Sequence, residues 1–294
     1  MDLRVINYFL TVAQEGNITR AAEILHITQP TLSRQIMELE EELGATLIIR
    51  GKRHITLTEE GILFQERARE ISTLIKKTEN EFKEQSLRDG GRLSIGCIQS
   101  LSSELMMKFI ENFSKKYPKM RFDLLTGYSN DIKEKLDRGL IDIGLLSEPI
   151  EISKYNFLRL EQDEEWGVIV PKDDPIAQRE CIELREVADK PLIVPSRENI
   201  YNELLNWFGY ENGDLHIFST YDLIANSLIL VMNGLGYAVG MRGPVCVRYN
   251  SEVKFIPLTP ERRTKSVIVW RKNHTMTTAA TLFLENIDKK YILQ

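Results

Sequence analysis

The chain has 294 residues, 43% of them hydrophobic and 28% charged, and its formal net charge is −5. This length and composition fit a soluble protein with several domains. No apolar run approaches the length of a membrane span, and the first residues lead into an amphipathic helix rather than a signal peptide. We therefore expect a cytoplasmic protein with no membrane partner, and one without a broad basic surface for nucleic acid.

Reactive and metal-binding groups are few. Three widely spaced cysteines, Cys97, Cys181 and Cys246, are typical of reduced thiols, although a redox pair of Cys181 with Cys246 is an alternative. The four histidines have no zinc-ligand spacing. There is no phosphate-binding loop, dinucleotide-binding loop or G-x-S-x-G motif. We expect no metal, no cofactor and no catalytic residues, so the chain is not expected to be an enzyme.

Residues 17–36 predict two short helices joined by a tight turn. Thr28 is a suitable N-cap for the second helix, and Pro30 fits its first turn. An apolar stripe along this helix is expected to face a core, and it consists of Leu32, Ile36, Leu39 and Leu43. Small polar and basic residues occupy the other face, as in a helix that enters the major groove of DNA.

Residues 47–58 predict a β-hairpin with a basic tip. Two short β-prone runs flank residues 50–53, where Gly51 marks the turn. A basic tip beside a recognition helix can reach phosphates or the minor groove. The first 58 residues nevertheless contain one more acidic than basic side chain. Affinity for DNA must then come from individually placed charges and from more than one copy of the domain.

Residues 59–88 predict a long helix. Its apolar positions alternate in steps of four and three, and they are Phe64, Ala68, Ile71, Ile75, Thr78, Phe82 and Gln85. Such a heptad seam requires a partner helix, which favours dimerisation through this segment. Packing of the helix against its own domain is the alternative. Residues 86–91 are expected to break the helix and to act as a hinge.

From Arg92 onwards, short strands alternate with helices, which indicates an α/β fold with parallel strands. We expect a first lobe from residues 91–161 and 266–294, closed by a helix over 282–292. Residues 162–265 form the second lobe. Short strands at 158–160 and 168–170 are expected to lead away from the first lobe.

Ligands of such sheets bind beyond the carboxyl ends of the strands and at helix N-termini. The candidate effector-binding residues at these places are Gln99, Ser100, Ser102, Thr126, Ser147, Pro195, Ser196 and Thr220. The hydroxyls and free backbone N–H groups of residues 99–103 suit a carboxylate or phosphate. The set therefore favours a small anionic or polar effector. Arg197 and Arg242 are weaker candidates, because most surface arginines are only solvated.

The N-terminal segment resembles the winged helix-turn-helix of LysR-type transcriptional regulators. The residues that carry the resemblance are 21–22, 27–36, 39–40, 43–44, 47–50 and 57–61. It implies a DNA-binding domain at 1–58, a linker helix at 59–88 and a two-lobed α/β effector domain resembling type 2 periplasmic binding proteins. The candidate DNA-binding residues are Arg20, Thr28, Gln29, Pro30, Thr31, Ser33, Arg34, Arg50 and Arg53.

The resemblance also implies partners. They are double-stranded promoter DNA with an interrupted inverted repeat, a second subunit held through the linker helix, a tetramer of two such dimers, a small-molecule effector and RNA polymerase. We thus expect a sequence-specific transcriptional regulator controlled by an effector bound between the two C-terminal lobes. The alternative is a small-molecule binding protein or clamp-type enzyme whose N-terminal helices only oligomerise it.

Overall fold

The computed structural model describes residues 1–51, 54–83, 91–209, 215–243 and 251–293. The chain folds as two compact units, Met1–Gln85 and Ser86–Gln294. The expected hinge falls mostly outside the described residues. Within the described parts, no helix is both long enough and apolar enough to span a membrane.

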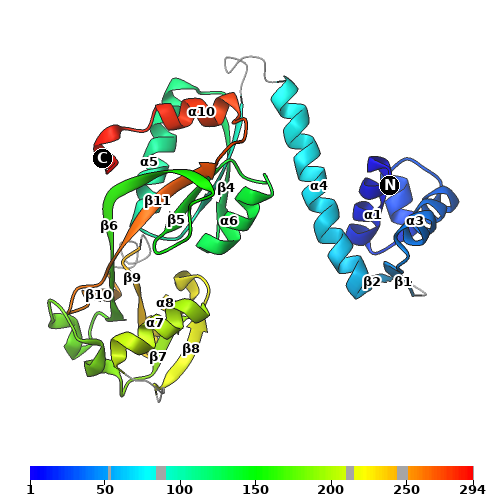
Figure 1. Cartoon of the computed structure of the whole chain (residues 1–294). Helices are drawn as coiled ribbons and strands as arrows, with labels where there is room; N and C mark the ends of the chain where they lie inside the picture. Colours follow the sequence, from blue (N-terminus) through cyan, green and yellow to red (C-terminus); the bar gives the residue numbers. More distant parts are fainter. Residues whose placement is uncertain (52–53, 84–90, 210–214, 244–250, 294) are drawn as a thin grey trace. The chain divides into compact units, whose positions relative to one another are not determined.

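The first unit has three short helices, a two-stranded sheet and a long helix (Figure 1). Its elements are α1 (Leu3–Glu15), α2 (Ile18–Ile24), α3 (Gln29–Leu43), β1 (Ile48–Arg50), β2 (Ile55–Leu57) and α4 (Glu59–Lys83). Side-chain caps start the three short helices, including Thr28 at α3, as expected. Gly16 and Gly44 end α1 and α3 in the left-handed conformation that favours glycine.

The core of this unit lies between α1, α3 and the sheet. Leu32, Ile36 and Leu39 of the predicted stripe are buried there. Leu43 is 42% exposed, so its predicted burial is wrong. It is the last residue of α3, where the helix ends at Gly44 and no further turn covers it.

Helix α4 begins against this core. The Phe64 ring packs edge-to-face on Phe9 of α1 with ring centroids 4.9 Å apart, and Ala68 is fully buried. Gly61 allows this approach, because a Cβ atom there would overlap the carbonyl oxygen of Leu47. The first part of the predicted heptad seam is therefore used inside its own unit.

The second unit is built on a continuous mixed sheet with helices on its faces (Figure 1). Along the sheet the strands follow the order β4-β3-β5-β11-β6-β9-β7-β8, and β10 pairs with β6. Separate apolar cores divide the unit into two lobes, which we call lobe 1, with one cluster of buried residues, and lobe 2, with two.

Lobe 1 has a parallel sheet in which β3 pairs with both β4 and β5. Its elements are β3 (Arg92–Cys97), α5 (Leu101–Lys116), β4 (Arg121–Thr126), α6 (Ser129–Asp137), β5 (Ile143–Ser147), α10 (Thr278–Glu285) and η3 (Lys289–Tyr291). The predicted final helix over 282–292 is wrong in position. Thr277 caps α10 early, and the helix ends at Glu285 with Asn286 as its C-cap.

Lobe 2 repeats the arrangement, with β7 parallel to β8 and β9. Its elements are η1 (Pro175–Gln178), η2 (Leu184–Val187), β7 (Leu192–Pro195), α7 (Glu198–Phe208), β8 (Ile217–Tyr221), α8 (Ile224–Met232), β9 (Tyr237–Met241) and β10 (Val253–Pro257).

Two long antiparallel strands join the lobes: β6 (Tyr155–Pro171) and β11 (Arg263–Arg271). The first half of β6 pairs with β11 in lobe 1, and its last residues pair with β9 and β10 in lobe 2. The two short strands predicted at 158–160 and 168–170 are thus one strand of 17 residues. The sequence did not reveal this continuity, because the middle of β6 is polar and lacks an apolar strand pattern. Its backbone hydrogen bonds to β11 do not depend on apolar side chains.

Candidate functional site

The N-terminal end of α3 presents the candidate DNA-reading residues. Gln29, Pro30, Thr31 and Arg34 are exposed there. The Thr28 and Thr31 hydroxyls lie 2.8 Å apart and bond to each other. Gln and Arg side chains pair with adenine and guanine, respectively, in the major groove. Exposed Gln29 and Arg34 can therefore supply base contacts, and the two threonines shape the start of the helix.

Arg34 and Arg20 each have an intramolecular partner. The Arg34 guanidinium pairs with Glu38 at 3.4 Å on the same helix, and Arg20 pairs with Glu15 at 2.9 Å. Both arginines remain mostly exposed. Exposed pairs of this kind are weak, so a phosphate or base can replace the carboxylate.

Ser33 is not on the open face of α3. It is only 9% exposed, and its hydroxyl accepts a hydrogen bond from Arg50 Nη1 at 3.1 Å. Ser33 lies three residues before buried Ile36, so it shares the covered side of the helix. The prediction that Ser33 faces outward is wrong for this structure. The bond instead connects α3 to the end of β1.

Glu40 also connects α3 to the hairpin. Its Oε1 accepts the backbone N–H groups of Leu47 and Ile48 at 2.7 and 3.0 Å. In the sequence, Glu40 is one of the acidic residues of this segment and one of the residues that carry the family resemblance, and no contact is predicted for it. Lys52 and Arg53 lie outside the described residues, so the contact predicted for Arg53 stays a prediction.

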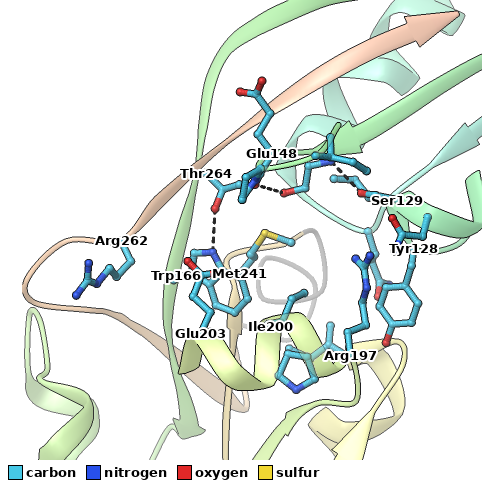
Figure 2. Close-up of a pocket in the computed structure, with 18 of the residues that line it drawn as sticks. Tyr128, Ser129, Glu148, Trp166, Arg197, Ile200, Glu203, Met241, Arg262 and Thr264 are labelled. Atoms are coloured by element: carbon cyan, nitrogen blue, oxygen red, sulfur yellow. Dashed lines mark hydrogen bonds between the residues drawn. The ribbon is translucent and has the colours of Figure 1, made fainter. Parts of the chain in front are cut away.

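A cavity of about 750 Å³ lies between lobe 1 and lobe 2 (Figure 2). Both lobes and the two crossing strands line it. Its apolar and aromatic lining includes Ile98, Tyr128, Ile150, Trp166, Ile200, Trp207, Tyr221, Leu223, Ile224 and Met241. Its charged lining consists of Glu148, Arg197, Glu203, Asp222, Glu261, Arg262, Arg263 and Lys265.

The eight predicted effector-binding residues divide into three groups. Gln99, Ser147 and Pro195 line the cavity. Ser100 and Ser102 are fully buried away from it. The remaining residues are exposed and outside its lining, and they are Thr126, Ser196 and Thr220. Thr126 and Thr220 belong to β4 and β8, which are the two edges of the sheet.

The start of α5 is already occupied by a carboxylate of the chain itself. Glu164, which is fully buried in β6, accepts the N–H groups of Leu101 and Ser102 at 3.0 and 2.8 Å. It also accepts the Ser266 hydroxyl at 3.3 Å. The free backbone N–H groups expected near residue 100 are therefore not free.

Tyr128 connects the two lobes across one side of the cavity. Its hydroxyl, from the start of α6 in lobe 1, donates to the Tyr221 carbonyl oxygen of lobe 2 at 3.1 Å. Burial raises the pKa of Tyr128, so the hydroxyl keeps the proton that it donates. Beside it, the Ser196 hydroxyl donates to Asp222.

Two tryptophans form an apolar corner of the cavity. The Trp166 and Trp207 rings meet edge-to-face with centroids 5.2 Å apart. The Trp166 indole N–H donates to Thr264 Oγ1 at 3.0 Å, which satisfies its polar atom (Figure 2). A flat apolar group can therefore lie against this corner without leaving the Trp166 indole N–H unpaired.

Comparison with known families accounts for both units. Residues 3–62 match the family model of the bacterial regulatory helix-turn-helix protein, lysR family. Residues 87–291 match the LysR substrate binding domain, which covers more than half of the chain. The chain belongs to the LysR family. It is a DNA-binding transcriptional regulator with an effector-binding domain, as the resemblance in its N-terminal motif predicted.

Relatives of this LysR-family chain match it over most of its length. The HTH-type transcriptional regulator BsdA of Bacillus subtilis (strain 168) is 30% identical over 291 residues, which cover 97% of this chain and 99% of that protein. The Hca operon transcriptional activator HcaR of Escherichia coli (strain K12) is 31% identical over 248 residues, covering 82% of this chain and 80% of that protein.

Solved structures show the same fold. Full-length CbnR in complex with its target DNA superposes with a TM-score of 0.76 at 21% identity, over 98% of this chain and 99% of that chain. The fold class predicted from the sequence, a winged helix-turn-helix followed by a long helix and an α/β effector domain, is confirmed.

Sequence reasoning missed several cavity residues of this LysR-family regulator. The sequence predicts no function for Tyr128, Trp166 or Trp207, and it places Trp207 only as part of a helix. Glu164, which binds the start of α5 and does not line the cavity, is one acid in an acidic stretch of β6. Only Glu164 could have been singled out from the sequence, because a carboxylate within a mostly paired strand needs hydrogen-bond donors when it is buried.

The cysteines offer little reactivity where the structure describes them. Burial raises the pKa of the Cys97 thiol to about 12, so it stays protonated near neutral pH. Cys181 is exposed. Cys246 lies outside the described residues, so the alternative of a Cys181–Cys246 pair stays untested.

Proposed function

We propose that this LysR-family regulator binds a small-molecule effector in the cavity between lobe 1 and lobe 2. The observation that carries the proposal is a cavity of about 750 Å³ lined by both lobes and bridged by Tyr128. A ligand that contacts both lobes favours one lobe arrangement over others and shifts the population accordingly. The regulator then acts by binding and not by catalysis.

We also propose how the chain reads DNA. Gln29 and Arg34 contact base edges, and Arg50 contacts the DNA backbone from the hairpin. Arg20 contacts phosphates and so helps to hold the recognition helix on the DNA. The exposure of Gln29 and Arg34 at the start of α3 supports this assignment. The remaining candidates, among them Thr28, Pro30 and Thr31, position the helix.

The assembly that we propose is a dimer through α4 and a tetramer of two dimers. Apolar side chains on α4 support it, since Leu63 and Leu74 are 55% and 38% exposed although Phe64 and Ala68 are used inside the unit. Residues 11 apart lie on the same side of a helix. A dimer presents two DNA-reading helices to an inverted repeat. We place the protein in the cytoplasm, with RNA polymerase as a further partner.

The decisive test of DNA reading compares the chain with its Arg34→Ala variant. Genomic fragments are captured with purified protein at physiological salt and sequenced. We expect a few promoter fragments with an inverted repeat from the parent chain and none from Arg34→Ala, which keeps its fold and oligomer size. Equal enrichment by both proteins would remove Arg34 from the base-reading set.

A further inference from the structure

Two cations of the cavity lining, Arg197 and Arg262, have no ion-pair partner among the described residues. Half of the eight charged lining residues form ion pairs. Glu148 binds Arg159 at 3.0 Å, Lys265 binds Asp163 at 2.5 Å, and Arg263 binds Glu261. No ion pair involves Arg197 among the described residues, although it is half-buried in the cavity wall.

Arg197 is held in place by an aromatic ring instead. Its guanidinium carbon lies 4.8 Å from the centre of the Tyr128 ring, and Figure 2 shows the two side chains side by side next to Ser129. This contact holds the guanidinium beside the ring and leaves its N–H donors for other acceptors. Arg197 also directly precedes α7, whose N-terminal end adds partial positive charge.

The start of α5 cannot serve the same purpose. Glu164 takes the N–H groups of Leu101 and Ser102, and the Ser103 N–H bonds to the Ser100 carbonyl oxygen at 3.2 Å. The fixed carboxylate of Glu164 also repels a second anion at this place. An anionic group in the cavity is therefore favoured near Arg197 and disfavoured at α5.

Arg262 is the other lining cation without an ion pair in the described chain, but its setting differs. Its guanidinium carbon lies 5.4 Å from the centre of the Trp207 ring, and Glu203 stands one turn before Trp207 on α7. In Figure 2 the Arg262 side chain points away from the cavity. Each cation has an acidic lining residue in its surroundings, Glu203 on the Arg262 side and Asp222, 3.4 Å from the Tyr128 hydroxyl, on the Arg197 side, so the direction of the Arg262 side chain is what separates the two.

We propose that Arg197 recognises a carboxylate of the effector, whose flat aromatic body lies against Trp166 and Trp207. A planar carboxylate can accept two parallel hydrogen bonds from a guanidinium, which an amide cannot match. The proposal rests on the proposed effector site and specifies the ligand class and the residue that reads its charge.

The test uses matched probe pairs on the full-length chain. Phenylacetate, 2-naphthoate and indole-3-acetate are each compared with their primary amides, and the dissociation constants are measured by ligand-observed NMR. We expect each acid to bind at least about tenfold more tightly than its amide, as charge-assisted hydrogen bonds predict. In Arg197→Gln the preference falls to about twofold or less.

The matched control is Arg242→Gln. Arg242 also lies over an aromatic ring, Phe255, at 5.8 Å, but it does not line the cavity. The Arg242→Gln variant should keep the full preference for the acids over their amides. A preference that survives in Arg197→Gln, or that is lost only in Arg262→Gln, overturns the proposal, as does equal binding of acids and amides or no binding by any probe.

A cavity-filling variant separates this proposal from the proposed function. Ile200→Trp adds an indole where Ile200 lines the cavity. If it leaves the binding of acids and amides unchanged, the cavity is not the effector site and the proposed function fails. If it abolishes binding while Arg197→Gln retains the acid preference, the cavity stands and only the role of Arg197 fails.

Discussion

The carboxylate of Glu164 accepts the backbone N–H of Ser102 at 2.8 Å, although the two residues are 62 positions apart. The bond joins β6, which crosses between the lobes, to the first turn of α5. Removing a buried carboxylate that accepts three hydrogen bonds lowers the free energy of unfolding, because each donor is left without a partner.

Glu164→Ala should therefore lower the free energy of unfolding of the second unit by about 2–4 kcal/mol. All three tryptophans of the chain follow residue 86, so their fluorescence during urea denaturation reports on this unit. Glu164→Gln keeps the side-chain shape and one acceptor oxygen, and it should lose less. A loss below about 0.5 kcal/mol in Glu164→Ala, within the scatter of ordinary surface changes, would contradict the anchoring role.

Tyr128→Phe should loosen the contact between the lobes. The change removes the hydroxyl that donates to the Tyr221 carbonyl and keeps the ring under Arg197. One net hydrogen bond corresponds to a shift of about two- to tenfold toward separated lobes. Hydrogen exchange should rise at the Ser196 amide, which bonds to the same carbonyl oxygen.

Tyr237→Phe is the control for this experiment. Its hydroxyl donates to Asp174 within lobe 2 at 2.6 Å, so the same atom is lost without a contact between lobes. Equal exchange changes at Ser196 in the two variants would mean that Tyr128 does not hold the lobes together.

Ser33→Ala should weaken DNA binding through Arg50. The Ser33 hydroxyl accepts a hydrogen bond from Arg50 Nη1 at 3.1 Å. Its loss therefore removes the partner that positions the Arg50 guanidinium and does not remove a base contact. We expect a three- to tenfold weaker complex in the parent chain and no further loss in an Arg50→Ala background. Fluorescence anisotropy with a captured promoter fragment measures both effects. Additive losses would show that Ser33 contacts DNA itself.

Leu74→Glu should disrupt the proposed dimer. A carboxylate on the exposed apolar side of α4 must be desolvated in any helix pair that buries it. We expect monomers at micromolar concentration in sedimentation velocity. Ile24→Glu, at a residue 50% exposed on α2, should sediment like the parent chain. An intact dimer in Leu74→Glu would exclude this side of α4 from the interface.

Cys97 should resist alkylation in the folded protein. Its pKa of about 12 leaves almost no thiolate at pH 8, and unfolding removes the burial that raises the pKa. Mass spectrometry after iodoacetamide treatment should find Cys181 modified first and Cys97 only in urea. Early labelling of Cys97 would reveal local opening of lobe 1.

Local patterns predicted the N-terminal unit well. Thr28 caps α3, Leu32, Ile36 and Leu39 are buried, and the hairpin strands bracket Gly51. These features follow from spacings of three, four and two residues, which a sequence displays directly. The outward assignment of Ser33 failed because the hairpin covers that side of the helix.

The cavity was harder to predict from strand ends. Gln99, Ser147 and Pro195 do line it, but Ser100 and Ser102 are buried behind it. The rule that ligands meet strand ends locates a region, whereas the orientation of each side chain depends on what packs there. Glu164 reaches α5 only because β6 continues through both lobes.

The sequence by itself determined the family, the DNA-reading helix and the alternation of strands and helices, because caps and apolar periods act between neighbours in the chain. The tertiary structure alone decided that Glu164 fills the start of α5, that Tyr128 bridges the lobes and that Arg197 is left without a carboxylate partner in the described chain. These relationships join residues such as Tyr128 and Tyr221, which are 93 positions apart. Such contacts depend on how two lobes pack around shared strands, and no local pattern records that packing.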